Sequence, residues 1–272
     1  MKSILLPTDF SSTARRAIRY ALSIFGEKVK YTLLNTYEVP YSGTTMLISI
    51  ADVLQKESEK GLEEELKFLL GEFPHLSEQI VTKTEMGVPE TVVRHLNEKE
   101  NYDLVVMGTK GATGLKEVLI GSVASNVMQE VSCPILAVPE SADLSVPVKI
   151  LFAVDDNSLN EGVFPAELAS LVRRFDAELM ILNVVAEGEG KGVGNAEGTN
   201  TDSMSVFDGV KHSVHFVEDN DVNNAIASFA EKEDVDMLAM VTRKSDFFSK
   251  LFGRSATKKM MQHTNLPIIA FH

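Results

Sequence analysis

Short runs of consecutive apolar residues recur along the chain, separated by segments in which apolar residues return every three or four positions. Such runs predict buried strands, and the spacing between them predicts helices. In the first half, strands are expected at residues 2–9, 31–35, 102–107 and 133–138, and helices at 14–25, 47–70, 89–97 and 123–131. Ser11 or Ser12 is the candidate N-cap of the first helix. Strands that alternate with helices and are apolar throughout indicate a parallel sheet covered on both faces.

The same series of elements occurs twice. Residues 2–9 recur as 148–155, 102–107 as 235–240, and 133–138 as 266–271, and a weaker match pairs 31–35 with 179–183. The boundary falls in a polar stretch that ends at Pro147. We therefore predict an α/β protein of two tandem domains, residues 1–140 and 147–272, each a five-stranded, doubly wound parallel sheet.

The second copy has no counterpart of the long helix expected at residues 47–70. In its place stand residues 187–200, which are rich in Gly, Glu and Asn. This composition predicts a mobile loop.

Length and composition agree with two ordinary soluble domains. The chain has 272 residues, 44% hydrophobic and 24% charged, and no apolar run is long enough to cross a bilayer. Because the N-terminus leads directly into a strand pattern, we expect a cytoplasmic protein. The single cysteine, Cys133, precedes Pro134 at the start of a predicted strand. It is expected to fill the core and to have no redox role.

The formal net charge of -13 limits the partners that the chain can bind. An acidic field repels both nucleic acid and anionic lipid, so neither is an expected partner. Any phosphate ligand must then be held by local backbone amides and a few side chains.

A glycine-rich motif follows the fourth predicted strand of the first copy. It has the spacing Gly-x-x-Gly-x9-Gly-Ser and runs from Gly108 to Ser122. Glycines at the carboxyl end of a parallel strand let the backbone approach a ligand, and the amides that open the next helix attract an anion. The alternative is that Gly108, Gly111 and Gly114 form tight turns and that Ser122 is an ordinary N-cap. The full spacing, at the edge where open α/β sheets bind ligands, favours a nucleotide site.

This motif resembles the signature of the ATP-binding branch of the universal stress protein family. Residues 4–11 (ILLPTDFS), the turn from Gly87 to Pro89 and residues 133–138 (CPILAV) are also similar to that family. The resemblance covers the first copy from end to end and the second copy more weakly. It implies an adenine nucleotide alpha hydrolase-like, Rossmann-like fold in a stress-response protein. The expected ligand is ATP or another adenine nucleotide, with or without Mg²⁺, bound by a regulatory module.

The resemblance also implies the residues that contact the nucleotide. Thr8 and Asp9 would lie against the adenine and Thr36 at its edge, with Asp9 a suitable acceptor for the amino group. The ribose would be lined by Pro7, Met107 and Gly108. The phosphates would be bound by Lys110, Gly111, Gly121, Ser122, Val123 and Ala124. Two alternatives stay open: Lys110 could be a solvated loop lysine, and Asp9 could also act as an N-cap.

The second copy has lost the three glycines of the motif. The corresponding residues are Val241, Lys244 and Arg254. Side chains at these positions predict a blocked or altered site. An open alternative is that Arg243, Lys244 and Arg254 form a different anion pocket or reach a ligand of the first copy.

Several enzyme classes lack their motifs in this chain. Neither a P-loop nor a Gly-x-Gly-x-x-Gly turn after a strand is present, and residues 7–12 do not match the Ser-Gly-Gly-x-Asp-Ser loop of adenylating enzymes. His212 and His215 lie three apart on a predicted strand, which places them on opposite faces and argues against a zinc site. His95 and His263, on predicted helices, are expected to cap or to face solvent. The sequence therefore contains no recognisable catalytic group.

Three function classes follow. A regulatory nucleotide-binding module is favoured. A slow ATP-hydrolysing enzyme is the alternative, with Glu117 as the only acidic residue inside the glycine loop. The third class is a structural module with an empty site.

The family resemblance also implies how the two copies associate. Family members commonly dimerise through their last strands, so residues 135–138 and 268–271 are expected to pair in an intramolecular pseudo-dimer. A homodimer of two chains and an unidentified protein partner are left open.

Overall fold

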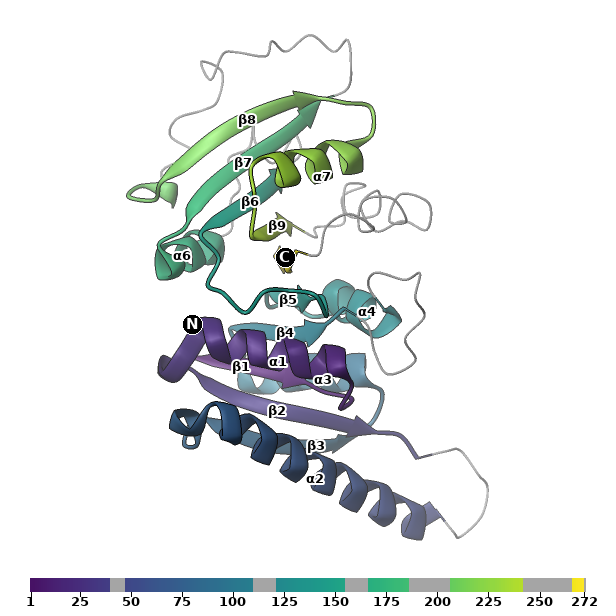
Figure 1. Ribbon diagram of the computed structural model, residues 1–272. Helices are drawn as coiled ribbons and strands as arrows, with labels where there is room; N and C mark the ends of the chain where they lie inside the picture. The colour runs from purple at the N-terminus through teal and green to yellow at the C-terminus, as the bar shows by residue number, and fades with distance from the viewer. Residues whose placement is uncertain (40–46, 110–120, 155–165, 186–205, 242–265, 272) are drawn as a thin grey trace. The chain divides into compact units, whose positions relative to one another are not determined.

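The computed structural model describes residues 1–39, 47–109, 121–154, 166–185, 206–241 and 266–271 (Figure 1). The chain divides into two compact units, Met1–Ser145 and Val146–His272. Each unit contains a parallel sheet of five strands with helices packed on it. The predicted fold class is therefore confirmed.

The first unit has the strand order β3-β2-β1-β4-β5, and all of its strand pairs are parallel. Its strands are β1 (Ser3–Pro7), β2 (Lys30–Tyr37), β3 (Ile80–Met86), β4 (Leu104–Gly108) and β5 (Ile135–Val138). Its α-helices are α1 (Ser12–Phe25), α2 (Leu47–Glu72), α3 (Pro89–Glu100) and α4 (Ser122–Glu130). The strand order reverses between β1 and β4, which makes the carboxyl ends of these strands the expected place for a ligand.

Burial explains the apolar strand patterns. The central strands β1 and β4 and the strand β5 are almost completely buried, because helices cover both faces of the sheet (Figure 1). The strand β3 lies at the end of the order and exposes several side chains, Val81 and Met86 among them. Its mixed pattern suits an edge position.

The helix bounds lie within three residues of the predicted ones. The Ser11 hydroxyl caps α1 by accepting the Ala14 amide at 3.2 Å, and Pro89 occupies the first turn of α3. The helices α2 and α3 continue to Glu72 and Glu100, beyond the predicted ends at 70 and 97. The additional residues are exposed and polar, so the apolar spacing does not reveal them. None of the helices in the described ranges has the length and apolar character needed to cross a membrane.

The second unit repeats this topology. Its strand order is β8-β7-β6-β9-β10, again with parallel pairs. The strands are β6 (Lys149–Val154), β7 (Glu178–Val185), β8 (His212–Glu218), β9 (Met237–Val241) and β10 (Ile268–Phe271), and the described helices are α6 (Ala166–Phe175) and α7 (Val222–Lys232). The loop predicted at residues 187–200 lies outside the described residues.

Cys133 lies in the core of the first unit, as its place before a strand predicts. Its side chain is buried, and burial raises the pKa of the thiol to about 12. A thiol with this pKa stays protonated at neutral pH and is a poor nucleophile.

An aspartate ties the fourth strand of each unit to the start of the first. Asp103 Oδ2 accepts hydrogen bonds from the backbone amides of Lys2 and Ser3 at 2.6 and 2.8 Å. In the second unit, Asp236 Oδ2 accepts two backbone amides at the start of β6, at 2.9 and 2.8 Å. The duplicated chain therefore contains the same carboxylate clamp twice.

Replacing Asp103 with asparagine is expected to destabilise the protein near neutral pH and to matter less in acid. Burial alone would raise the pKa of Asp103, but the hydrogen bonds from Lys2 and Ser3 outweigh it, and the pKa lies below its ordinary value. The stabilisation is therefore present above the ordinary carboxyl pKa of about 3.9 and is lost as the pH falls through the lowered value. Urea unfolding between neutral pH and acid measures this, with Asp52→Asn as an exposed control. A difference between Asp103→Asn and the parent that does not change with pH would contradict it.

Candidate functional site

A cavity of about 220 Å³ lies at the carboxyl ends of the central strands of the first unit. The residues that line it come from the ends of β1, β2 and β4 and from the starts of α1, α3 and α4. This is the edge at which the strand order reverses. The position agrees with the general rule for ligand sites in open parallel sheets.

The cavity collects most of the residues that the sequence singles out. The predicted residues in its lining are Pro7, Thr8, Asp9, Thr36, Met107, Gly108, Gly121, Ser122, Val123 and Ala124. Lys110 and Gly111 lie outside the described residues. That these residues contact a nucleotide stays a prediction.

Six further residues line the cavity that were not among the predicted nucleotide contacts. They are Ala14, Leu34, Asn35, Pro89, Val93 and Thr109. Asn35 had a usable signal, because a carboxamide in an otherwise apolar buried strand needs hydrogen-bond partners. Ala14, Leu34 and Val93 had none, since an apolar position that lines a cavity has the same sequence pattern as one that fills the core.

The two ends of the glycine motif meet at the cavity. The Gly121 amide donates a hydrogen bond to the Thr109 carbonyl oxygen at 2.5 Å. This amide was expected to bind phosphate, and here it is engaged within the protein. The hydrogen bond holds the start of α4 beside the end of β4.

The first turn of α4 offers backbone donors to the cavity. Gly121 is the N-cap residue of this helix and has no side chain with which to cap it. The first amides of a helix have no partner within the helix and carry the positive end of its dipole. Ser122, Val123 and Ala124 supply these amides, and all three line the cavity. The arrangement suits the binding of an anion such as a phosphate group.

Gly108 is required by packing as well as by the motif. A Cβ atom at this position would lie 2.9 Å from the Thr13 carbonyl carbon and 3.0 Å from its oxygen. Backbone atoms cannot rotate away from such a contact. Glycine at the end of β4 therefore allows α1 to pack closely against this strand.

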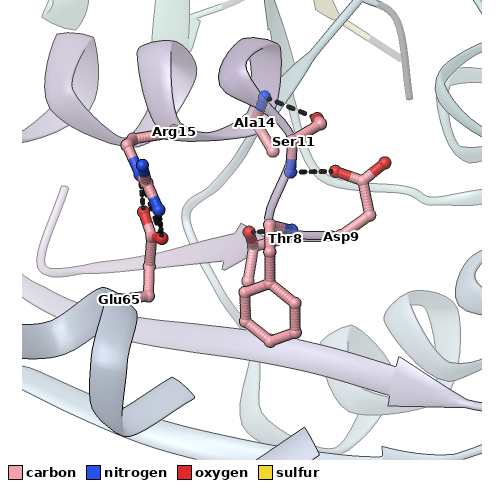
Figure 2. A network of polar contacts seen from close by, with 7 residues as sticks. Thr8, Asp9, Ser11, Ala14, Arg15 and Glu65 are labelled. Atoms are coloured by element: carbon pink, nitrogen blue, oxygen red, sulfur yellow. Dashed lines mark hydrogen bonds and ion pairs between the residues drawn. The ribbon is translucent and has the colours of Figure 1, made fainter. Parts of the chain in front are cut away.

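Internal hydrogen bonds shape the turn between β1 and α1, where Thr8 lies buried (Figure 2). The Thr8 amide donates to the Leu34 carbonyl at 2.8 Å, and its hydroxyl accepts the Phe10 amide at 3.0 Å. Phe10 has a φ of 63°, in the left-handed region that residues with a side chain seldom adopt. Hydrogen bonds within the turn and to β2 therefore contribute to holding it in this unusual conformation.

Asp9 lies exposed on this turn and lines the cavity. Its Oδ1 accepts the Ser11 amide at 3.1 Å (Figure 2), while Ser11 itself caps α1. Asp9 therefore supports the turn that leads into the helix without being its N-cap. A carboxylate has further acceptor positions, so this bond does not prevent Asp9 from accepting a hydrogen bond from a ligand.

The histidines of β8 lie in separate environments. The His212 ring nitrogen Nδ1 is 2.9 Å from the Val210 carbonyl oxygen, whereas His215 Nε2 is 2.8 Å from the Ser213 hydroxyl, and its ring centroid is 4.9 Å from that of Phe229. These different neighbours agree with the predicted opposite faces. Across the described ranges, no three His, Cys, Asp or Glu side chains are grouped so that they could hold a metal ion.

Both units match the same family model. The model, described as the universal stress protein family, matches residues 1–139 and residues 148–272. The chain belongs to the universal stress protein family. The family resemblance is therefore confirmed for both copies, including the second, which lacks the motif glycines.

Individual relatives align with about one unit each. The universal stress protein MJ0531 of Methanocaldococcus jannaschii is 33% identical over 144 residues, which cover 50% of this chain and 81% of the relative. The universal stress protein Sll1388 of Synechocystis is 26% identical over 148 residues, 50% of this chain and 96% of the relative.

Solved structures match the fold over both units. A universal stress protein from Archaeoglobus fulgidus superposes with a TM-score of 0.71 at 20% identity, over 99% of this chain and 95% of that one. The protein PA1789 from Pseudomonas aeruginosa gives a TM-score of 0.60 at 16% identity, over 100% and 92% of the two chains. These matches show the universal stress protein fold.

The second unit of this universal stress protein differs from the first where β9 ends. Val241 closes β9 and pairs with Phe271, just as Gly108 closes β4 and pairs with Val138. A β-branched side chain thus stands where the first unit has a glycine. The other two changed glycine positions, Lys244 and Arg254, and the neighbouring Arg243 lie outside the described residues.

Proposed function

We propose that the first unit of this universal stress protein binds ATP or a related adenine nucleotide as a regulatory module in a stress response. The observation that carries the proposal is the uncapped first turn of α4, whose amides share one cavity with Asp9 and Thr36. The amides suit phosphate oxygens, and the Asp9 carboxylate suits the adenine amino group. Membership in the family supports the same ligand class.

The charge of the chain agrees with this type of site. With a formal net charge of -13, the protein as a whole does not attract an anionic nucleotide over long range. Backbone amides at a helix start supply local positive potential that does not depend on the net charge. The nucleotide would then stabilise the first unit in proportion to its affinity and concentration.

No turnover is expected at this site. Phosphoryl transfer needs metal-holding groups and a residue that orients the attacking water, whereas Asp9, the one carboxylate among the described residues of the cavity, is expected at the adenine. If Mg²⁺ accompanies the nucleotide, the phosphate oxygens would be its main ligands. Slow hydrolysis is the alternative, and a phosphate-release assay on purified protein distinguishes it from binding alone.

The second unit is proposed to act as a built-in partner of the first. Its glycine positions carry larger residues, so it is not expected to bind the same ligand in the same way. We propose that the two units pair through their last strands, Ile135–Val138 and Ile268–Phe271. A homodimer of two chains and a protein partner that responds to the nucleotide are further parts of the proposal.

Substituting Gly121 with valine is expected to weaken ATP binding by roughly tenfold or more, equivalent to at least about 1.4 kcal/mol. The reason is that a branched side chain at the start of α4 enters the wall of the cavity and disturbs the turn that presents the amides. Gly111→Val is expected to act in the same direction. Mass spectrometry of the ligand released from the native protein identifies the nucleotide, and calorimetric titration of the emptied protein gives its affinity.

The matched control is Arg254→Val, at the corresponding position of the second copy. It is expected to leave the ATP affinity unchanged, whereas a loss would favour the alternative in which Arg254 reaches the ligand. Circular dichroism checks that each variant is folded. Equal binding by the parent, Gly111→Val and Gly121→Val would refute the site. A parent protein that carries no nucleotide, and whose melting temperature ATP does not change, would favour a structural module.

A further inference from the structure

One face of α2 contacts the turn between β1 and α1 that forms part of the candidate nucleotide site. The face consists of Ser58, Gly61 and Glu65, which are spaced three and four residues apart and therefore lie on the same side of the helix. None of the three lines the cavity. Ser58 contacts a residue that does line it, and the other two contact residues that directly follow the cavity-lining part of the turn.

The first contact is a buried chain of hydrogen bonds that ends on Thr8. The Ser58 hydroxyl donates to Asn35 Oδ1 at 2.7 Å, and Asn35 Nδ2 donates to the Thr8 carbonyl oxygen at 2.7 Å. Ser58 and Asn35 are only 4% and 8% exposed, and the Ser58 hydroxyl also contacts the Thr84 hydroxyl. Because buried polar groups need their partners, this chain fixes the Thr8 carbonyl relative to α2.

The second contact joins Gly61 to Phe10. A Cβ atom at Gly61 would lie 2.6 Å from the Phe10 ring, so the ring packs directly on the backbone of α2. Phe10 is the residue with the left-handed backbone conformation. Such a conformation persists only where the surroundings stabilise it, and the contact with Gly61 is part of that support.

The third contact is the ion pair of Glu65 with Arg15 in the first turns of α1. Arg15 Nε donates to Glu65 Oε1 at 2.9 Å and Nη2 donates to Oε2 at 2.5 Å (Figure 2). The Glu65 side chain is 1% exposed. The two-pronged geometry fixes orientation as well as distance, so that α1 is held against α2 just beyond the turn.

The second unit provides an internal comparison. Asn183 in β7 corresponds to Asn35, and its Nδ2 lies 3.4 Å from the Val154 carbonyl oxygen. Its Oδ1 is buried and has no hydrogen-bond partner in the described part of the chain. Both units therefore have the asparagine. Within the described residues, only Asn35 of the first unit accepts a hydrogen bond from a serine.

We infer that the face formed by Ser58, Gly61 and Glu65 is a positioning element of the nucleotide site. It holds the β1–α1 turn in the conformation that places Thr8 and Asp9 at the cavity, and it sets the nucleotide affinity without touching the nucleotide. This inference rests on the proposed function. Because coupling between two sites is reciprocal, bound nucleotide strengthens the packing of α2 against the turn.

The sharpest test compares two glycines of the same helix. Gly61→Ala places a methyl group against the Phe10 ring, whereas Gly71→Ala meets no atom within 4 Å. Both changes favour the helix, so a purely structural effect of added helix propensity is the same in both. We expect Gly61→Ala to weaken ATP binding by roughly tenfold and Gly71→Ala to leave it unchanged, as measured by calorimetric titration.

Ser58 supplies the second test. Ser58→Ala leaves the Asn35 oxygen without its donor, and a loss of ATP affinity of roughly fivefold or more is expected. Ser58→Thr keeps the hydroxyl and is expected to restore most of the affinity. Hydrogen exchange on the parent protein gives an independent readout, since ATP should slow exchange of the α2 amides around residues 58–65.

The outcomes separate this inference from the proposed function. If the parent does not bind ATP, the proposed function fails. If the parent binds ATP and the folded variants Gly61→Ala and Ser58→Ala bind it equally well, the inference is overturned. Should either variant not fold, unchanged exchange of α2 in the presence of bound ATP overturns the inference, and slowed exchange supports it.

Discussion

Replacing Arg15 with leucine is expected to lower the free energy of unfolding by about 3 kcal/mol. The substitution leaves the Glu65 carboxylate, which is 1% exposed, without its positive partner. It also removes the guanidinium group that lies 4.5 Å above the Phe68 ring. The expected value is at the lower end for buried pairs, because Arg15 itself is 39% exposed. Urea or guanidinium unfolding followed by circular dichroism measures the change.

The neighbouring pair on the same two helices is the matched control. Arg19 Nη2 lies 2.5 Å from Glu72 Oε1, with similar geometry, but Glu72 is 34% exposed. Arg19→Leu is therefore expected to cost less than about 1 kcal/mol. In the double variant Arg15→Leu, Glu65→Leu no buried charge is left unpaired, and part of the stability should return. Equal losses for Arg15→Leu and Arg19→Leu would show that burial does not decide the strength of these pairs.

Gly108→Ala is expected to destabilise the protein by about 2 kcal/mol, within the usual cost of overpacking. The added Cβ atom meets the Thr13 backbone at 2.9 Å, so α1 or β4 must shift. Gly71→Ala, which meets nothing, is expected to stabilise by up to about 1 kcal/mol through helix propensity. Thermal and chemical unfolding in the absence of nucleotide compare the two. A Gly108→Ala protein as stable as the parent would mean that this glycine is needed only for the ligand.

Much of the fold can be predicted from the sequence because both faces of each sheet are covered. Strands buried on both sides must be apolar throughout, and this pattern locates β1, β4 and β5 and their repeats. The glycine spacing leads to the cavity for a similar reason: Gly108 must be small for α1 to pack, and the Gly121 amide is hydrogen-bonded to Thr109 at the end of β4. Local constraints of this kind restrict which residue type can occupy the position, so the sequence reveals them.

The rest of the site depends on contacts between segments that are far apart in the sequence. Arg15 and Glu65 are 50 residues apart, and either one alone has the pattern of a solvated helix residue. The left-handed conformation of Phe10 has no sequence signal, because this residue type does not favour it. The hydrogen bond from the Gly121 amide to Thr109 was likewise not predictable. The motif indicates that the backbone approaches another group closely, but it does not show which atom accepts the hydrogen bond.

The carboxylate clamp on the first strand has a consequence for folding. Asp103 and Lys2 are 101 residues apart, and Asp236 and Val148 are 88 apart. In each unit the first strand therefore lacks its neighbour on one side until the fourth strand has been synthesised. Contacts of such long range close slowly and delay the folding transition. A nascent chain that ends before residue 103 has a β1 edge open to pairing with other chains, so each unit is exposed to aggregation until its fourth strand has been made.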